Sequence, residues 1–308
     1  MSTDSRLRRT DHPAPSWELS GPPGAPVIVV LGGISASRHV TATTNDTSDG
    51  WWQLLVGPAA AVDTRRFRVL GIDWLAPEQG SISTHDQADA LLAVLDQLGI
   101  ERVSTILGAS YGGMVALAFA ARHPTRVERL AIISGAHAPH PMATAHRVIQ
   151  RRIIRLGLAA GLPTEGVTLA RALGMTTYRT VTEFAARFAA EPEPQGEVPV
   201  FPVERYLDYG SRKFAASWSA ERYLALSESI DLHQVDPAEV KTPTAILGVR
   251  EDTLVPCWQL RELRDRLDAP ARLEEISSIY GHDAFLKEID AVASFVAGAL
   301  EQEVRRAA

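Results

Sequence analysis

The chain has 308 residues, of which 45% are hydrophobic and 22% charged, and its formal net charge is −6. These values are ordinary for a folded globular protein and exclude an intrinsically disordered chain. The negative balance argues against nucleic acid or an anionic membrane surface as a partner.

The single cysteine, Cys257, excludes an intrachain disulfide and argues against a thiolate metal site. The stretch from Met1 to Trp17 is polar and carries arginines, without the apolar core of a secretory signal. No apolar run approaches the ~20 residues that span a bilayer. We therefore expect a cytoplasmic protein with no membrane partner.

Apolar runs and helical spacing alternate along the chain. Buried strands are expected where β-branched residues follow one another, and helices where apolar residues recur every three or four positions. The predicted elements, in chain order, are a frayed lead-in (1–20), strand Val27–Leu31, a polar loop (35–50), strand Phe67–Asp73, a helix from an N-cap at Thr84 to Gly99, strand Val103–Leu107, helix Met114–Arg122, strand Leu130–Ile133, strand Thr244–Val249, helix Trp258–Leu267, strand Leu273–Ser277 and helix Ile289–Val304.

Residues 138–228 follow a different pattern, because strand-like runs vanish there and helical periodicity prevails. The alternation elsewhere predicts an α/β fold with a mostly parallel sheet covered on both faces. We expect a core made of residues 1–137 and 229–308, and a helical lid made of residues 138–228. The lid would cover the carboxyl edge of the sheet, where sites of α/β folds lie.

Gly108-Ala109-Ser110-Tyr111-Gly112 fits the pattern G-x-S-x-G and stands between a predicted strand and a predicted helix. The turn in this motif is so tight that side chains two residues on either side of the serine would clash. The strained turn presents the serine hydroxyl at the edge of the sheet. The bare pentapeptide often arises by chance, but in this context it predicts that Ser110 is a nucleophile.

A serine nucleophile needs a base, and the base needs an acid to orient it. In the fold that carries this motif, the acid and then the histidine follow the serine in the chain. Asp252 and His282 come in that order, each after a late predicted strand. Glu251 is the nearest rival to Asp252. No histidine cluster shows the spacing of a metal site.

An oxyanion hole requires two backbone N–H groups. One is expected from Tyr111, directly after the nucleophile, and one from Ile34, after Gly32-Gly33 at the end of the first strand. A plain β-turn is the alternative for the two glycines.

Several further segments are not general features of hydrolases. The chain resembles the homoserine O-acyltransferases, which are α/β-hydrolase-fold enzymes of methionine biosynthesis. The segments that carry the resemblance are Gly50-Trp51-Trp52, Gly57-Pro58, Ala61–Phe67 (AVDTRRF), Gly108–Met114 (GASYGGM), Gln150–Ile154 (QRRII), Leu169–Tyr178 (LARALGMTTY) and Tyr280–Leu286 (YGHDAFL).

The resemblance implies a ping-pong reaction in which Ser110 takes an acyl group from acyl-CoA and passes it to an amino-acid hydroxyl. Acyl-CoA is then a co-substrate, and no bound cofactor is expected. The resemblance also places Arg171, Tyr178 and Asp283 near the amino acid, and it implies a homodimer formed through the lid helices. The alternatives are a solvated helix-face arginine for Arg171 and lid packing for Tyr178.

The identity of the acyl donor depends on charge, because burying the free carboxylate of a succinyl group requires a cation. Arg38 and His39 follow the oxyanion loop, and the shortened chain resembles homoserine O-succinyltransferases, so succinyl-CoA is favoured. A surface role or a contact with CoA phosphate is the alternative for Arg38. The alternative functions are those of a homoserine O-acetyltransferase, a serine O-acyltransferase, an esterase with the same triad and a non-catalytic binding protein.

Overall fold

A seven-stranded sheet forms the centre of the molecule in this computed structural model, which describes residues 14–76, 80–195 and 198–301. Its strands, in spatial order, are β1 (Trp17–Ser20), β5 (Arg68–Ile72), β2 (Val27–Leu31), β6 (Val103–Ala109), β7 (Val127–Ile133), β10 (Thr244–Val249) and β11 (Ala271–Ile276). Every neighbouring pair is parallel except β1 with β5. The predicted mostly parallel sheet is confirmed.

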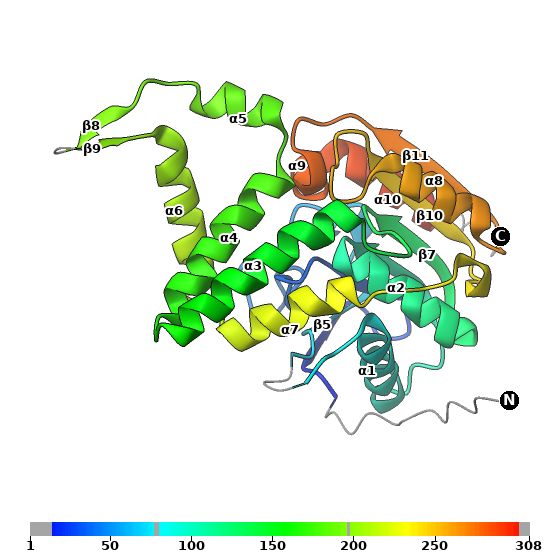
Figure 1. The fold of residues 1–308 in the computed structure, drawn as a ribbon. Coiled ribbons are helices and arrows are strands. Elements are labelled where there is room, and N and C mark those ends of the chain that lie inside the picture. The colour runs from blue at the N-terminus through cyan, green and yellow to red at the C-terminus, as the bar shows by residue number, and fades with distance from the viewer. Residues whose placement is uncertain (1–13, 77–79, 196–197, 302–308) are drawn as a thin grey trace, which may run out of the picture.

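Helices cover both faces of this sheet (Figure 1). They are α1 (Thr84–Gln97), α2 (Tyr111–Arg122), α8 (Cys257–Arg266), α9 (Ala284–Lys287) and α10 (Ile289–Glu301). Within β2, Val29 and Leu31 belong to the apolar cluster that includes α1 and α2, whereas Ile28 and Val30 belong to the cluster that includes α10. Because successive side chains of a strand face opposite sides, a strand with both faces covered must be apolar throughout.

The helical insertion lies between β7 and β10, which are neighbours in the sheet. It contains α3 (Pro141–Ala159), α4 (Pro163–Tyr178), α5 (Val181–Phe188), α6 (Pro202–Ala215) and α7 (Ala220–Asp231). Figure 1 shows these helices grouped beside the sheet, with α6 and the segment beyond α5 extending away from the core. The insertion has its own small apolar cluster, centred on Ile154, Val167 and Tyr223. Among the described residues, no helix is long and apolar enough to cross a membrane.

Two short pairings differ from the predictions. Residues 17–20 form β1 on the edge of the sheet rather than part of a frayed lead-in; residues 1–13 lie outside the described residues. The insertion also contains an antiparallel pair, β8 (Glu193–Gln195) and β9 (Val198–Val200). Both pairings are set by contacts between strands, which runs of only three or four residues do not signal.

The minor elements connect the main ones. They are β3 (Val56–Gly57), β4 (Val62–Asp63) and the 3₁₀ turns η1 (Pro124–Arg126), η2 (Pro237–Glu239) and η3 (Gly281–Asp283). No helix or strand interrupts residues 35–50, as predicted. The predicted helix 289–304 is described only as far as Glu301, because residues 302–308 lie outside the described part of the chain.

The N-cap of α1 is Ser83 rather than the predicted Thr84. Ser83 Oγ accepts a hydrogen bond from the Asp86 N–H, and the Asp86 carboxylate accepts one from the Ser83 N–H at 2.8 Å. This reciprocal capping box satisfies two amides at the helix end. Thr84 is the first helical residue, and its buried hydroxyl is hydrogen-bonded to His233 Nδ1 at 2.7 Å.

Candidate active site

Ser110 stands at the turn from β6 into α2, with φ 55° and ψ −119°. This backbone conformation is strained for a residue with a side chain, and such strain gathers at functional sites. A Cβ on Gly108 would lie 2.4 Å from the Gly112 carbonyl oxygen, and a Cβ on Gly112 would lie 2.3 Å from the Leu31 carbonyl oxygen. The packing therefore explains why the motif requires both glycines.

Ser110, His282 and Asp252 form one hydrogen-bonded chain. Ser110 Oγ lies 2.8 Å from His282 Nε2, and His282 Nδ1 lies 2.7 Å from Asp252 Oδ2. Asp252 Oδ1 accepts hydrogen bonds from the backbone N–H groups of Leu254 and Val255 at 2.8 and 3.0 Å. His282 and Asp252 are buried. Because both carboxylate oxygens of Asp252 are hydrogen-bonded, the acid is held in place and orients the base.

Burial and the neighbouring Asp252 have the largest effects on the pKa of His282. Burial lowers it, because the charged imidazolium loses water. The charge of Asp252 and its hydrogen bond raise the pKa, and the net result is a pKa above the ordinary histidine value. Asp252 therefore stabilises the protonated form that a general base reaches when it removes a proton.

Glu251, the rival acid, faces a different part of the molecule. Its carboxylate accepts hydrogen bonds from the Ser278 N–H at 2.8 Å and from the Ser277 hydroxyl. The structure therefore brings Asp252, and not Glu251, to His282.

The two predicted oxyanion donors lie beside Ser110. Ile34 follows β2, Tyr111 begins α2, and both residues line the same pocket as Ser110. Within the described residues, neither backbone N–H has a hydrogen-bond acceptor. Both amides therefore remain available for a developing oxyanion.

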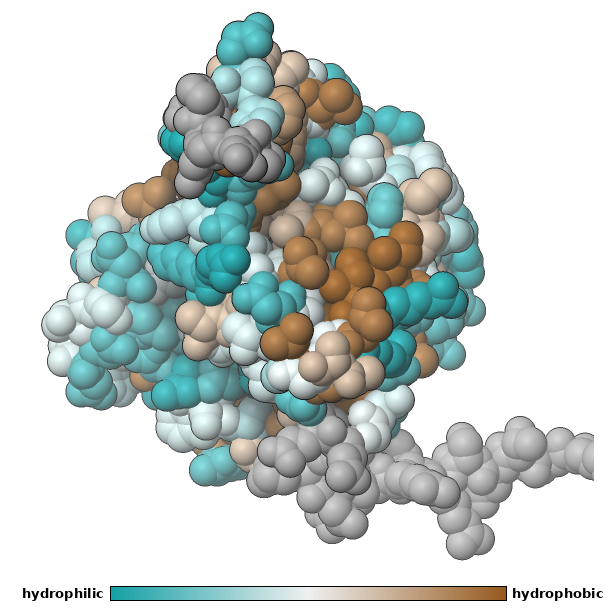
Figure 2. Space-filling model, turned by 60° about the vertical axis from the view of Figure 1, so that its left-hand side comes forward, coloured by the Kyte–Doolittle hydropathy of each residue, from teal (hydrophilic) through white to brown (hydrophobic). Residues whose placement is uncertain are grey.

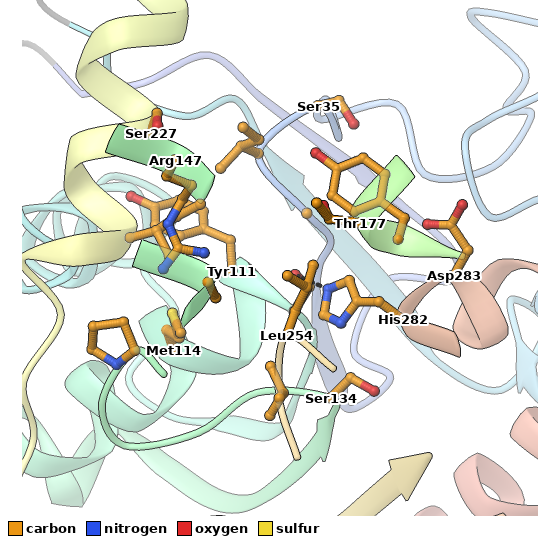
Figure 3. Close-up of a pocket in the computed structure, with 18 of the residues that line it drawn as sticks. Ser35, Tyr111, Met114, Ser134, Arg147, Thr177, Ser227, Leu254, His282 and Asp283 are labelled. Atoms are coloured by element: carbon orange, nitrogen blue, oxygen red, sulfur yellow. Dashed lines mark hydrogen bonds between the residues drawn. The ribbon is translucent and has the colours of Figure 1, made fainter. Parts of the chain in front are cut away.

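The pocket lies between the carboxyl edge of the sheet and the insertion (Figure 3). Residues from α3, α4 and α7 line it together with residues of the core. Its charged lining residues are Arg147, Arg171 and Asp283, next to the imidazole of His282. Such a pocket suits a small ligand that carries charges of both signs.

The residues expected near an amino acid are brought together at this pocket. Arg171 Nη1 donates to the Tyr178 hydroxyl at 3.4 Å, and the guanidinium carbon lies 4.5 Å from the centre of the Phe214 ring. The buried Nε of Arg171 has no partner within the described chain. The ring of Tyr178 lies 6.4 Å from that of His282. Arg171 can therefore donate further hydrogen bonds to a carboxylate.

Asp283 also has a protein partner, which the sequence did not suggest. Arg179, directly after α4, donates from Nε to Asp283 Oδ2 at 2.8 Å and from Nη1 to Glu183 Oε1 at 2.6 Å. The neighbouring Thr180 hydroxyl donates to the Ile279 carbonyl. These contacts join the insertion directly to the loop that carries His282.

Arg38 lies outside the pocket. Its side chain is 48% exposed and forms an ion pair with Asp73. His39 is hydrogen-bonded to Glu18 at 2.8 Å and to the Ser48 carbonyl at 2.9 Å. The structure therefore brings neither predicted cation to the acyl group, because both are paired in the loop that follows β2.

Sequence reasoning missed Arg147, which lines the pocket from α3. Its Nε donates to Asp231 Oδ1 at 2.8 Å. Four positions later on the same helix, Arg151 Nη1 lies 2.7 Å from Asp231 Oδ2. The i, i+4 spacing of two arginines is a usable signal that they share one face, but the exposed Arg152 and Arg155 hide it in the sequence.

Comparison with known proteins agrees with this geometry. The family model described as alpha/beta hydrolase fold matches residues 26–289. The chain is 44% identical to a homoserine O-succinyltransferase from Xanthomonas campestris pv. campestris, over 92% of this chain and 78% of that protein. It is 33% identical to a serine O-succinyltransferase from Litchfieldella anticariensis, over 92% of this chain and 90% of that one.

A solved structure shares the fold. The crystal structure of a homoserine O-acetyltransferase from Bacillus anthracis superimposes with a TM-score of 0.82 at 21% identity, covering 92% of this chain and 91% of that one. The predicted fold and the predicted resemblance are both confirmed. On the extent and level of these matches, the chain belongs to the homoserine O-acyltransferase family, a group of acyltransferases with the α/β-hydrolase fold.

Proposed function

We propose that the protein transfers a succinyl group from succinyl-CoA to the hydroxyl of L-homoserine in two half-reactions, through an ester on Ser110. The observation that carries the proposal is the pocket itself, where the Ser110–His282–Asp252 chain opens onto Arg171 and Asp283. A charge of each sign suits the carboxylate and the ammonium of an amino acid. An esterase that uses water has no need of either.

In the first half-reaction, His282 Nε2 removes the proton of Ser110 Oγ, which attacks the thioester carbonyl carbon. The N–H groups of Ile34 and Tyr111 stabilise the resulting oxyanion. The bond to sulfur then breaks, and the CoA thiolate takes the proton from His282. Succinyl-Ser110 remains, and Asp252 keeps the imidazole oriented throughout.

In the second half-reaction, His282 removes the proton of the homoserine hydroxyl, which attacks the succinyl-Ser110 carbonyl. The Ser110–acyl bond breaks, and Ser110 Oγ takes back the proton. Arg171, with Tyr178 beside it, binds the carboxylate of the acceptor, and the Asp283 oxygen that Arg179 leaves free binds its ammonium. Holding the hydroxyl close to the ester makes transfer faster than hydrolysis.

A matrix of donors and acceptors tests the proposal. CoA release should be fastest with succinyl-CoA and L-homoserine, and Ser110→Ala should abolish it. A higher kcat/KM with acetyl-CoA would contradict succinyl-CoA as the proposed donor. A higher kcat/KM with L-serine would contradict L-homoserine as the proposed acceptor. Ester hydrolysis without CoA or amino acid would indicate an esterase.

We further propose that the protein is a cytoplasmic homodimer joined through the insertion. Most of the large apolar side chains that are exposed in the described structure belong to the insertion, including Ile149, Leu156, Leu162 and Leu169. Apolar surface also gathers as a continuous brown area on the face drawn in Figure 2. Exposed apolar surface of this kind marks interaction sites. The buried free thiol of Cys257 fits a reducing compartment.

A further inference from the structure

Two arginines share one carboxylate at the wall of the pocket. Arg147 approaches Asp231 Oδ1 with two nitrogens, at 2.6 and 2.8 Å, and Arg151 approaches Oδ2 at 2.7 Å. The side chains of Arg147, Arg151 and Asp231 are only 13%, 9% and 11% exposed. The cluster therefore carries a surplus positive charge in a poorly hydrated position, where an anionic partner is stabilising.

The surplus charge faces the cavity through Arg147. Arg151 is held away from it by further hydrogen bonds to the Ser227 carbonyl and hydroxyl, both at 3.0 Å. Arg147 uses Nε and Nη2 for Asp231 and Thr144, while its Nη1 has no partner among the described residues. The protein thus fixes the guanidinium through Nε and Nη2, and Nη1 can donate to a carboxylate.

Arg147 and Asp283, the residue assigned to the ammonium of the amino acid, lie on opposite sides of His282 (Figure 3). Figure 3 shows Arg147 and Ser227 to the left of His282 and Asp283 to its right. Asp283 already has Arg179 as its cationic partner, so Asp283 does not neutralise the Asp231 cluster. A second anionic group is therefore expected on the Arg147 side of the nucleophile.

We propose that Arg147 binds the terminal carboxylate of the succinyl group, both in the acyl-CoA donor and in the ester on Ser110, and so selects a dicarboxylic acyl group. The inference rests on the proposed function. During the transfer step, the cavity holds the carboxylate of the acyl group and the carboxylate of the amino acid at once. Arg147 and Arg171 provide one guanidinium for each, and Asp231 with Arg151 positions Arg147.

Butyryl-CoA is the matched donor for a test, because it has the same chain length as succinyl-CoA and no carboxylate. Arg147→Gln should lower kcat/KM for succinyl-CoA by about 10- to 100-fold, the range expected when a hydrogen bond between charged groups is lost. Arg147 also lowers the pKa of His282, so both proteins are compared at a pH above the acidic limb, where His282 is unprotonated. There, with butyryl-CoA, kcat/KM should stay within about threefold, as should the KM for homoserine, because the acyl contact is what the change removes. Arg147→Lys should recover part of the preference.

Arg155→Gln is the control, since Arg155 is an exposed arginine of the same helix. This substitution should leave the ratio of kcat/KM for succinyl-CoA to kcat/KM for butyryl-CoA unchanged. Arg151 still pairs with Asp231 in the Arg147 variants, so a thermal melt should show that they remain folded. If Arg147→Gln lowers kcat/KM equally for both donors, or for neither donor, the assignment is overturned.

A binding measurement separates this inference from the proposed function. Calorimetry on Ser110→Ala without any amino acid should show tighter binding of succinyl-CoA than of butyryl-CoA, and Arg147→Gln in the same background should remove the difference. Equal binding of the two donors, or no binding of either, overturns the role of Arg147. Absence of homoserine-dependent CoA release from the unaltered enzyme would instead overturn the proposed function, whatever the calorimetry shows.

Discussion

His282 is the residue whose protonation sets the pH range of the proposed chemistry. Its pKa is raised overall, since the nearby Asp252 carboxylate outweighs the effect of burial. A base with a raised pKa keeps its proton to higher pH, and the protonated imidazole cannot accept the proton of Ser110. Activity should therefore increase with pH as His282 loses its proton.

The acidic limb of kcat/KM should consequently have an apparent pKa above the ordinary histidine value of about 6.5. Asp252→Asn removes the carboxylate that raises the pKa of His282 most, so the limb should move to lower pH. The same change should lower kcat by about 10⁴-fold, as in other Ser–His–Asp enzymes. A pH–rate profile of both proteins measures each effect.

Glu251→Gln is the control for that experiment, because Glu251 is the adjacent carboxylate and faces Ser277 and Ser278 instead of His282. Its acidic limb should stay in place. A limb that shifts with Glu251→Gln and not with Asp252→Asn would show that the wrong acid has been assigned.

At the scale of elements, the capping box of α1 makes a clear stability prediction. Ser83→Ala should lower the free energy of unfolding by about 1 kcal/mol, because the N–H of Asp86 loses its acceptor. Urea unfolding monitored by circular dichroism measures the change. Ser81→Ala is the control, since its exposed hydroxyl makes only a 3.4 Å contact with Glu228. Equal losses from both changes would contradict the assignment of the cap.

The elements that sequence predicts well are those with a local signal. Strand β2 is apolar at every position because both of its faces are covered, and the Gly108–Gly112 turn is constrained by clashes within a few residues. Chain order then identified Asp252 and His282, because the late strands of a parallel sheet end at the same edge as β6. The fold and the three residues of the hydrogen-bonded chain were therefore predictable.

What sequence could not supply depends on distant contacts. Strand β1 is a half-buried, four-residue segment whose register is set by β5, some fifty residues away. Arg38 and Arg147 are both arginines near predicted site elements, and only the positions of Asp73 and Asp231 decide which one lines the pocket. The composition of each segment is the same in either arrangement, so a local pattern cannot distinguish them.

At the scale of the whole molecule, the proposed homodimer can be tested by mass. Light scattering after size-exclusion chromatography should give about twice the 33.4 kDa of one chain. Leu156→Glu, in α3 of the insertion, should shift the mass towards one chain, because a charge would be buried at the interface. The matched control is Leu54→Glu, which lies outside the insertion and has the same exposure: Leu156 is 72% exposed and Leu54 71%. A monomer before any substitution would contradict the proposal.

The contacts of Arg179 and Thr180 have a consequence for the timing of catalysis. They fasten the junction of α4 and α5 to the loop that carries His282 and Asp283, so an outward swing of that junction breaks them and disturbs the base. An opening of this part of the insertion would therefore misalign His282 at the same time. In the proposed two-step reaction, an open state of this kind could not activate water, and the proposed succinyl ester on Ser110 would be protected from hydrolysis until the acceptor binds.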